Sequence, residues 1–306
     1  MAGKKRRKKK KKKSSALLNL FLGVGFLIGF GILIYPTVSE IWNTYRSQQL
    51  ISDYTEAVEE LESEDYSQLW AAAQEYNEQH TFNTIVDAFD EDEDEYVLSH
   101  PYDELLDPLG NGIMGYVEIP KISVKLAIYH GTSADVLAKG AGHIEGTSLP
   151  IGGTGTHAVS SAHRGLSNAK LFTDLDQLEI GDIFLLRILD ETLAYEVDQI
   201  LTVEPDEIEA LAIDEDMDLV TLVTCTPYGV NTHRLLVRGH RTEYVEEEAE
   251  STSVIVVRNP LEGTDQRQKL LVIAIVAFMI FISVLNVILS IRDRRRKRRN
   301  NRKEKE

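Results

Sequence analysis

Hydrophobic residues follow three patterns along the chain: long, almost entirely apolar runs near both ends, a helical periodicity after the first run, and short alternating runs in the middle. The two long runs, 16–36 and 270–291, contain no charged residue. Each is long enough to cross a hydrocarbon core of about 30 Å as an α-helix. The pattern therefore predicts one transmembrane helix near each end of the chain.

The segment 37–80 is predicted to be helical and to continue directly from the first span. Its apolar residues recur at near-helical spacing, with acidic residues between them: Leu50, Ile51, Tyr54, Val58 and Leu61. The next segment, 81–109, loses this periodicity and contains an unbroken acidic run at 91–95. We interpret it as an exposed acidic lid or linker.

Between residues 110 and 245 the pattern changes to short apolar or alternating runs, separated by turns rich in glycine and proline. These runs are typical of β-strands: 158–161, 183–188, 194–200, 219–225 and 234–239. Two further stretches, 134–139 and 169–178, favour short helices. The segment is therefore predicted to be an all-β-dominated domain, either a closed barrel or a sandwich, with short peripheral helices.

The formal net charge of -16 conceals a strong segregation of charge. Basic tails at 1–15 and 292–306 flank the two spans, and the chain between the tails carries a charge of about -33. By the positive-inside rule, both termini are cytoplasmic, and the β domain, with a stalk at 246–269, lies outside the cell membrane. A cleaved signal peptide remains the alternative for the first span.

The strong negative charge of the segment predicted to be extracellular also limits which molecules it can bind. It has too few basic residues to neutralise phosphates, which argues against nucleic acid. Basic or lysine-bearing partners are favoured instead, and the basic tails fit contact with anionic lipids.

Cys225 is the single cysteine of the chain and ends the apolar run 219–225. Exported proteins usually pair their cysteines, so an odd thiol outside the cell suggests a use as a nucleophile. A thiolate needs a nearby cation or histidine, and acyl transfer needs a proton donor and a group that stabilises the oxyanion. His163 and Arg234 are the candidates for these roles. The alternative is a buried, inert cysteine in a bitopic adhesion or scaffold domain.

The sequence around these residues resembles the sortase family in four motifs, in the same order along 110–241. They are Gly-Tyr-Val-Glu-Ile-Pro-Lys-Ile at 115–122, Ser-Ala-His-Arg-Gly-Leu at 161–166, Thr-Leu-x-Thr-Cys at 221–225 and Asn-Thr-His-Arg-Leu at 231–235. The resemblance implies a closed sortase-type β-barrel. It also implies that Cys225 attacks the Thr–Gly bond of a Leu-Pro-x-Thr-Gly-like (LPXTG-like) sorting signal, with His163 as acid and base and Arg234 holding substrate or oxyanion.

The second span and the Pro-Tyr-Gly sequence at 227–229 resemble class C, the pilus-assembling sortases. In this class the acyl group passes to a lysine amine of a pilin, and a lid with an Asp-Pro-aromatic motif covers the site. The chain departs from that motif, because Asp87-Ala88-Phe89 lacks the proline. We expect Phe89 to occupy the groove near Cys225 and Asp87 to pair with Arg234. A plain acidic linker is the alternative for this segment, and attachment of surface proteins to peptidoglycan is the alternative function.

The remaining histidines are expected to be structural. His157 lies six residues before His163, so both would face the same side of an extended strand. We assign His157 a supporting role, although it remains a second candidate for the base. Because no Cys/His cluster with metal-ligand spacing is present in the sequence, we expect neither a metal nor a cofactor.

Overall fold

The computed structural model describes residues 15–61, 63–79, 89, 101–166 and 169–243. Several predicted features lie outside these residues: most of the N-terminal basic tail, Asp87, the acidic run at 91–95, the stalk, the second span at 270–291 and the C-terminal tail.

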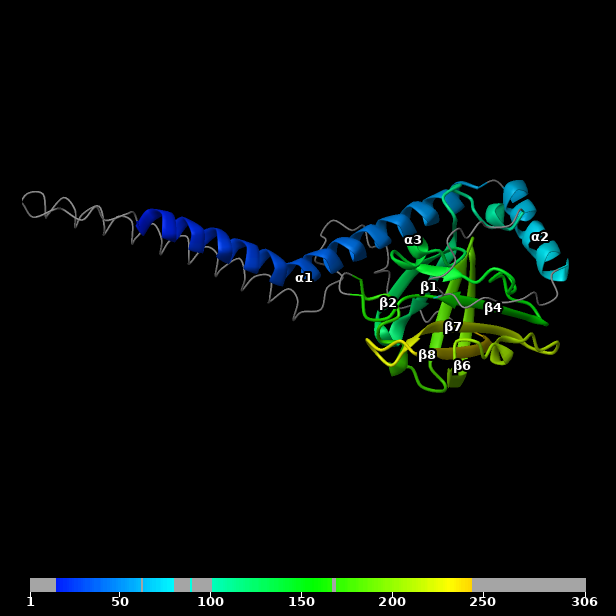
Figure 1. The fold of residues 1–306 in the computed structure, drawn as a ribbon. Helices are drawn as coiled ribbons and strands as arrows, with labels where there is room; N and C mark the ends of the chain where they lie inside the picture. The colour runs from blue at the N-terminus through cyan, green and yellow to red at the C-terminus, as the bar shows by residue number, and fades with distance from the viewer. Residues whose placement is uncertain (1–14, 62, 80–88, 90–100, 167–168, 244–306) are drawn as a thin grey trace, which may run out of the picture. The chain divides into compact units, whose positions relative to one another are not determined.

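The first span and much of the helical region after it form one helix, α1, Ser15–Glu60 (Figure 1). Within the described residues, only the stretch Gly23–Glu60 is long and apolar enough to cross a membrane, with a mean hydropathy of 1.7 in its most apolar window. Leu27, Ile32 and Leu33 are 63%, 70% and 71% exposed, which favours contact with lipid. The described residues therefore contain one candidate span, where the sequence predicted two for the whole chain.

The C-terminal half of α1 packs against the β domain. Tyr54 is almost fully buried, and its hydroxyl donates to Met114 O at 2.9 Å and accepts from Leu189 N at 2.8 Å. Ile51 joins the same buried cluster. The apolar stripe predicted for this region therefore covers the domain and does not form a free stalk.

The predicted helical region is not one helix: α1 ends at Glu60, Leu61 is not helical, and a second helix, α2, runs over Ser63–Gln79. Asn77 links α2 to the β domain through both ends of its amide: Nδ2 donates to Leu149 O at 3.2 Å, and Oδ1 accepts from Leu149 N at 2.7 Å. Ala73 and Tyr76 are buried in the main core.

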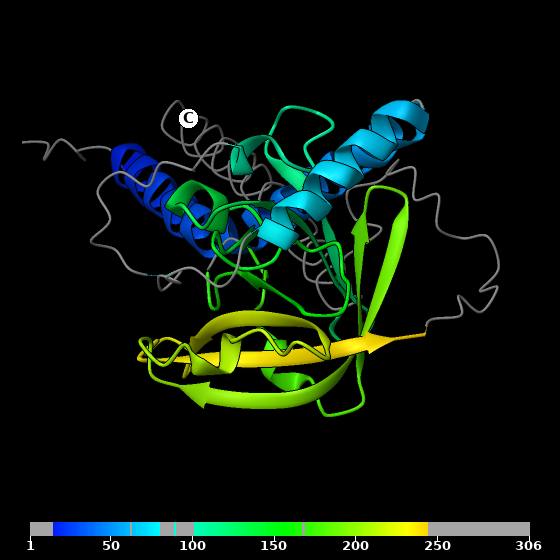
Figure 2. The ribbon, with the colours of Figure 1, turned by 90° about the vertical axis from the view of Figure 1, so that its right-hand side faces the viewer.

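The domain after α2 is an eight-stranded closed barrel with the spatial order β1-β2-β3-β4-β7-β8-β6-β5 (Figures 1 and 2). Its strands are β1 Ile113–Ile119, β2 Val124–His130, β3 Ala141–His143, β4 Thr156–Ser161, β5 Ile183–Ile188, β6 Glu191–Val203, β7 Asp218–Thr226 and β8 His233–Thr242. The predicted closed barrel is confirmed. Closure leaves no long unpaired strand edge, which suits a domain of short strands.

Short helical turns decorate the barrel: α3 Ala134–Leu137, η1 Tyr102–Glu104, η2 Pro120–Ile122, η3 Leu175–Gln177 and η4 Glu209–Leu211. The helix predicted over 169–178 is instead a series of turns that ends in η3. One reason is local, because Leu171 takes a positive φ of 42°, which a helix does not tolerate.

Alternation along the central strands separates an interior from an outer face. Ala158 on β4 and Ala162 just after it belong to the main core, whereas Val159 on β4 belongs to a second cluster. On β7, Leu222 faces the main core and Val223 the second cluster. This second cluster, made of Ile144, Val159, Leu211, Val223 and Leu236, is called the outer cluster below.

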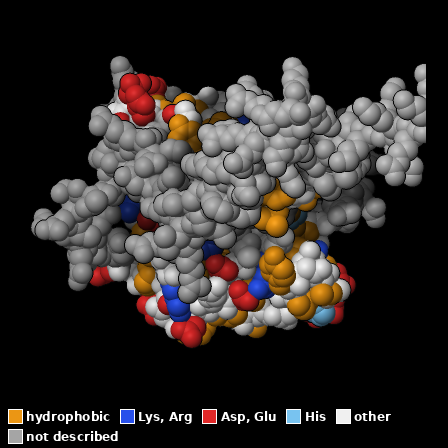
Figure 3. Space-filling view, turned by 90° about the vertical axis from the view of Figure 1, so that its left-hand side faces the viewer, with side chains coloured by type: hydrophobic (Ala, Val, Ile, Leu, Met, Phe, Trp, Pro, Cys, Tyr) orange, Lys and Arg blue, Asp and Glu red, His pale blue; other side chains and the backbone are white. Residues whose placement is uncertain are grey.

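The surface seen in Figure 3 mixes acidic, basic and hydrophobic side chains where it is described. The acidic side chains of the middle segment therefore do not form one continuous negative patch on the described part of that face.

Candidate active site

Cys225 lies near the end of β7, where β7 is hydrogen-bonded to β8. Its Cα partner across the antiparallel pair is Arg234, the second residue of β8. Both side chains are buried, with Cys225 6% and Arg234 8% exposed. Because directly opposed residues of an antiparallel pair point to the same face of the sheet, the thiol and the guanidinium share the outer face.

His163 lies two residues after Ser161, the last residue of β4, which pairs with the other edge of β7. β4 and β7 are parallel, with Ser161 opposite Val223, and Ala162 N donates to Val223 O at 3.1 Å. Continuing this register by two residues brings His163 level with Cys225. The Thr224 hydroxyl donates to Ala162 O at 2.7 Å and holds the two strand ends together.

Phe89 contacts two of the three predicted catalytic side chains. Its ring centroid lies 5.4 Å from that of His163, and the Arg234 guanidinium carbon lies 5.1 Å from it, within the range of a cation–π contact. Phe89 also packs against the outer cluster. The predicted partner of Arg234, Asp87, lies outside the described residues.

Burial lowers the pKa of His163 below its ordinary value. The imidazole is therefore neutral at pH 7 and able to accept a proton.

The Arg234 guanidinium is oriented by the loop that connects β7 to β8. Its Nη1 donates to the carbonyl oxygens of Asn231 and His233, both at 3.2 Å. Asn231 has a positive φ of 61°, a conformation that asparagine tolerates better than most residues. These acceptors could not be predicted from the sequence, because they are backbone carbonyls.

Comparison with known proteins identifies the family and the fold to which the chain is similar. Residues 117–242 match the family model of the sortase domain. The structure is similar to sortase C of Streptococcus pneumoniae, with 43% identity, a TM-score of 0.59, and coverage of 65% of this chain and 99% of that one. It is also similar to sortase C1 of Streptococcus agalactiae, with 46% identity, a TM-score of 0.58, and coverage of 64% and 100%.

The chain belongs to the sortase family. Its similarity to solved sortase C structures supports class C. Among curated proteins, sortase D of Bacillus subtilis is 31% identical over 130 residues, which are 42% of this chain and 63% of that protein. Sortase A of Bacillus anthracis is 28% identical over 127 residues. The chain thus spans about six tenths of the length of the curated relatives it matches.

Cys225, His163 and Arg234 all lie inside the matched sortase domain, whereas Phe89 lies outside it. The contacts of Phe89 therefore rest on this structure alone and not on the match to the family model.

Arg164, next to His163, has contacts that the sequence did not predict. It forms an ion pair with Asp176, its Nη1 donates to the Thr226 hydroxyl at 3.2 Å, and its guanidinium carbon lies 5.9 Å from the Tyr228 ring. These contacts tie the loop that carries His163 to the end of β7. They hold this loop beside the strand that carries Cys225.

His157 is buried on β4 with both ring nitrogens engaged. Nδ1 lies 2.9 Å from Ala212 O, and Nε2 lies 2.7 Å from the Thr221 hydroxyl. A neutral ring satisfies both contacts if Nδ1–H donates to the carbonyl and the hydroxyl donates to Nε2. His157 thereby attaches the segment between β6 and β7 to the barrel, in keeping with the supporting role expected for it. His233 instead lies 3.1 Å from the exposed Glu204 carboxylate.

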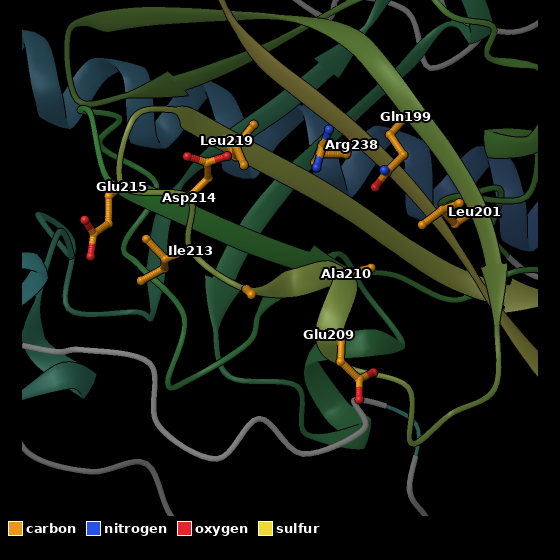
Figure 4. Close-up of a pocket in the computed structure, with 10 residues that line it drawn as sticks. Gln199, Leu201, Glu209, Ala210, Ile213, Asp214, Glu215, Leu219 and Arg238 are labelled. Carbon is orange, nitrogen blue, oxygen red and sulfur yellow. The ribbon is translucent and has the colours of Figure 1, made fainter.

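A pocket of about 670 Å³ lies beneath the same β6–β7 segment (Figure 4). Its walls include Leu201 and Arg238 from the barrel and Ala212 and Asp214 from the segment. Arg238 is held by a bidentate ion pair with Asp198, at 2.9 and 3.0 Å. The pocket therefore belongs to the same outer face as Cys225 but lies farther along the strands.

Proposed function

We propose that this sortase is a membrane-anchored cysteine transpeptidase. In this proposal it cleaves an LPXTG-like sorting signal between threonine and glycine and transfers the acyl group to the lysine amine of a pilin. The observation that carries the proposal is the opposition of Cys225 and Arg234 on adjacent strands, with His163 two residues beyond the end of β4 on the other side of β7.

The chemistry follows from these three groups. His163 takes the thiol proton, and the Cys225 sulfur attacks the threonine carbonyl carbon. Arg234 stabilises the oxyanion of the tetrahedral intermediate. The C–N bond then breaks, and His163 gives the proton to the departing glycine amine. A lysine amine attacks the resulting thioester and loses a proton to His163, and the thiolate leaves as the new amide bond forms.

Pilin lysine is proposed as the acceptor because of the class C similarity. One of the similar structures is a pilus-related sortase C of group B Streptococcus, 41% identical, covering 63% of this chain and 97% of that one. The acidic composition of the middle of the chain also favours a basic, lysine-bearing partner.

The proposed location is the cell membrane, with two spans, both termini in the cytoplasm and the barrel outside. The exposed apolar side chains of α1 support the first span. The basic run at 4–13 before that span supports its orientation.

Acceptor choice tests the proposal. The full-length protein in nanodiscs would be incubated with a sorting-signal peptide and equal concentrations of a pilin domain and a peptidoglycan-stem amine. We expect the acyl group on a pilin lysine, identified by mass spectrometry of the isopeptide-linked peptide. Predominant transfer to the peptidoglycan amine would favour the alternative function, and no cleavage under any condition would contradict both.

Phe89 is proposed to act as a lid residue. Phe89→Ala should raise the rate at which a thiol reagent labels Cys225 several-fold, because the ring no longer covers His163, Arg234 and the outer cluster. The rate would be followed by mass spectrometry of the intact protein.

A matched control is Leu109→Ala, which removes a partly exposed apolar side chain from the segment before β1. The control should leave the labelling rate unchanged. Equal labelling of the wild type and Phe89→Ala would rule out Phe89 as the cover of the thiol.

A further inference from the structure

Ser161, the last residue of β4, carries a buried side-chain hydroxyl. Its side chain is 0% exposed, and its Oγ has no hydrogen-bond partner among the described residues. Neighbouring hydroxyls are satisfied: Thr224 donates to Ala162 O at 2.7 Å, and Thr221 lies 2.7 Å from His157. A buried polar group without a partner destabilises a fold, so the one at Ser161 calls for an explanation.

The hydroxyl points to the outer face beside the catalytic residues. Ala158 and Ala162 face the main core, so Ser161 shares the other face with Val159 and His163. Across the strand pair its Cα partner on β7 is Val223, two residues before Cys225. Side chains two apart on one strand face are separated by about 7 Å. Ser161 is therefore about two residues of extended chain away from the level of Cys225.

The surroundings of Ser161 on this face are apolar. Val159 and Val223 belong to the outer cluster, and the Phe89 ring packs against that cluster. A peptide bound there in place of Phe89 would bury its side chains well, but its main-chain polar groups would lose water without gaining partners. The Ser161 hydroxyl, which has no hydrogen-bond partner among the described residues, can form a hydrogen bond with such a main-chain group.

We propose that the Ser161 hydroxyl binds a main-chain group of the acyl-donor peptide, about two residues from the scissile carbonyl. The proposal rests on the proposed function, since it concerns the peptide that Cys225 attacks. Ser161 is a binding residue and takes no part in proton transfer. The cost of the unsatisfied hydroxyl falls on the resting enzyme and is relieved when the peptide is bound.

The test is Ser161→Ala, which removes only the hydroxyl. Full-length protein would be assayed for cleavage of a sorting-signal peptide, in the wild-type and Phe89→Ala backgrounds, together with its thermal unfolding midpoint. We expect KM to rise about threefold to tenfold, the range of one neutral hydrogen bond, with kcat little changed. The midpoint should stay equal or rise, because an unsatisfied buried hydroxyl is lost.

This pair of readouts separates binding from a structural role. A structural hydroxyl would lower the midpoint and leave KM unchanged, and that result overturns the proposal, as does unchanged KM with a raised midpoint. Ser160→Ala is the matched control, since Ser160 is the adjacent buried serine on the opposite strand face. It should leave KM unchanged, and an equal rise in KM would overturn the assignment to Ser161.

The proposed function is checked in the same experiment. Wild-type cleavage that disappears in Cys225→Ala establishes the peptidase step independently of Ser161. Without that cleavage both proposals fail, whereas with it an unaffected Ser161→Ala variant removes only the binding role.

Discussion

Replacing Cys225 with alanine is expected to abolish both peptide cleavage and transfer while leaving the barrel folded. The sulfur is the only proposed nucleophile, and loss of a catalytic nucleophile lowers turnover by at least about a thousandfold. The measurement is the rate of peptide cleavage, with mass spectrometry for the thioester intermediate, which should be absent.

Stability distinguishes this outcome from simple damage to β7. Cys225 is 6% exposed, so removing its sulfur leaves a small cavity that costs about 1 kcal/mol of unfolding free energy. Val220→Ala is the matched control, because Val220 is a buried residue of the same strand that faces the main core. It should cost about 2 kcal/mol and still leave an active enzyme below its unfolding temperature.

Stability and activity should therefore rank the two variants in opposite orders: Cys225→Ala is the more stable but inactive, and Val220→Ala is the less stable but active. If Cys225→Ala still cleaves the peptide, Cys225 is an inert core residue, which is the alternative that its burial alone favours.

The barrel was predictable from sequence where its strands are long. The runs 183–188 and 219–225 alternate or stay apolar for six or more residues, and they correspond to β5 and β7 within one residue. β3 was missed because its three residues are too few to show a period. The turns over 169–178 were mistaken for a helix because their apolar spacing mimics one.

For the site, the sequence identified the candidate residues but not how they come together. The motif resemblance singled out Cys225, His163 and Arg234, although 62 positions separate the histidine from the cysteine. Their proximity depends on the parallel pairing of β4 with β7, which no local pattern reveals. Phe89 was selected from an incomplete motif, and only the structure shows its contacts with His163 and Arg234.

Other features of the site depend on backbone partners that carry no sequence signal. The carbonyl of Ala212, which lies 2.9 Å from His157, and those of Asn231 and His233, which accept from Arg234, are present in any residue type. The isolation of the Ser161 hydroxyl is likewise invisible until the surrounding side chains are placed.

Arg234→Lys is expected to lower kcat/KM by about a hundredfold or more, the scale for loss of one oxyanion-stabilising donor. In the structure, Nη1 donates to the carbonyls of Asn231 and His233, which fix the guanidinium plane beside the strand that carries Cys225. An ammonium has no rigid fork, so it cannot hold those carbonyls and also present donors in a fixed direction to the substrate. The loss should therefore fall on acyl-enzyme formation, measured by rapid quench and mass spectrometry.

Arg238→Lys provides the matched control on the same strand and face, four residues farther along β8. Arg238 is engaged by a bidentate ion pair with Asp198, so its replacement should reduce stability slightly and leave acyl-enzyme formation close to wild type. If Arg234→Lys behaves like this control, the positive charge alone is sufficient and the planar geometry of Arg234 has no part in catalysis. If only Arg234→Lys slows acyl-enzyme formation, the N–H donors of the Arg234 guanidinium stabilise the transition state. The comparison is direct, because both variants replace arginine with lysine and differ only in the groups that the guanidinium contacts.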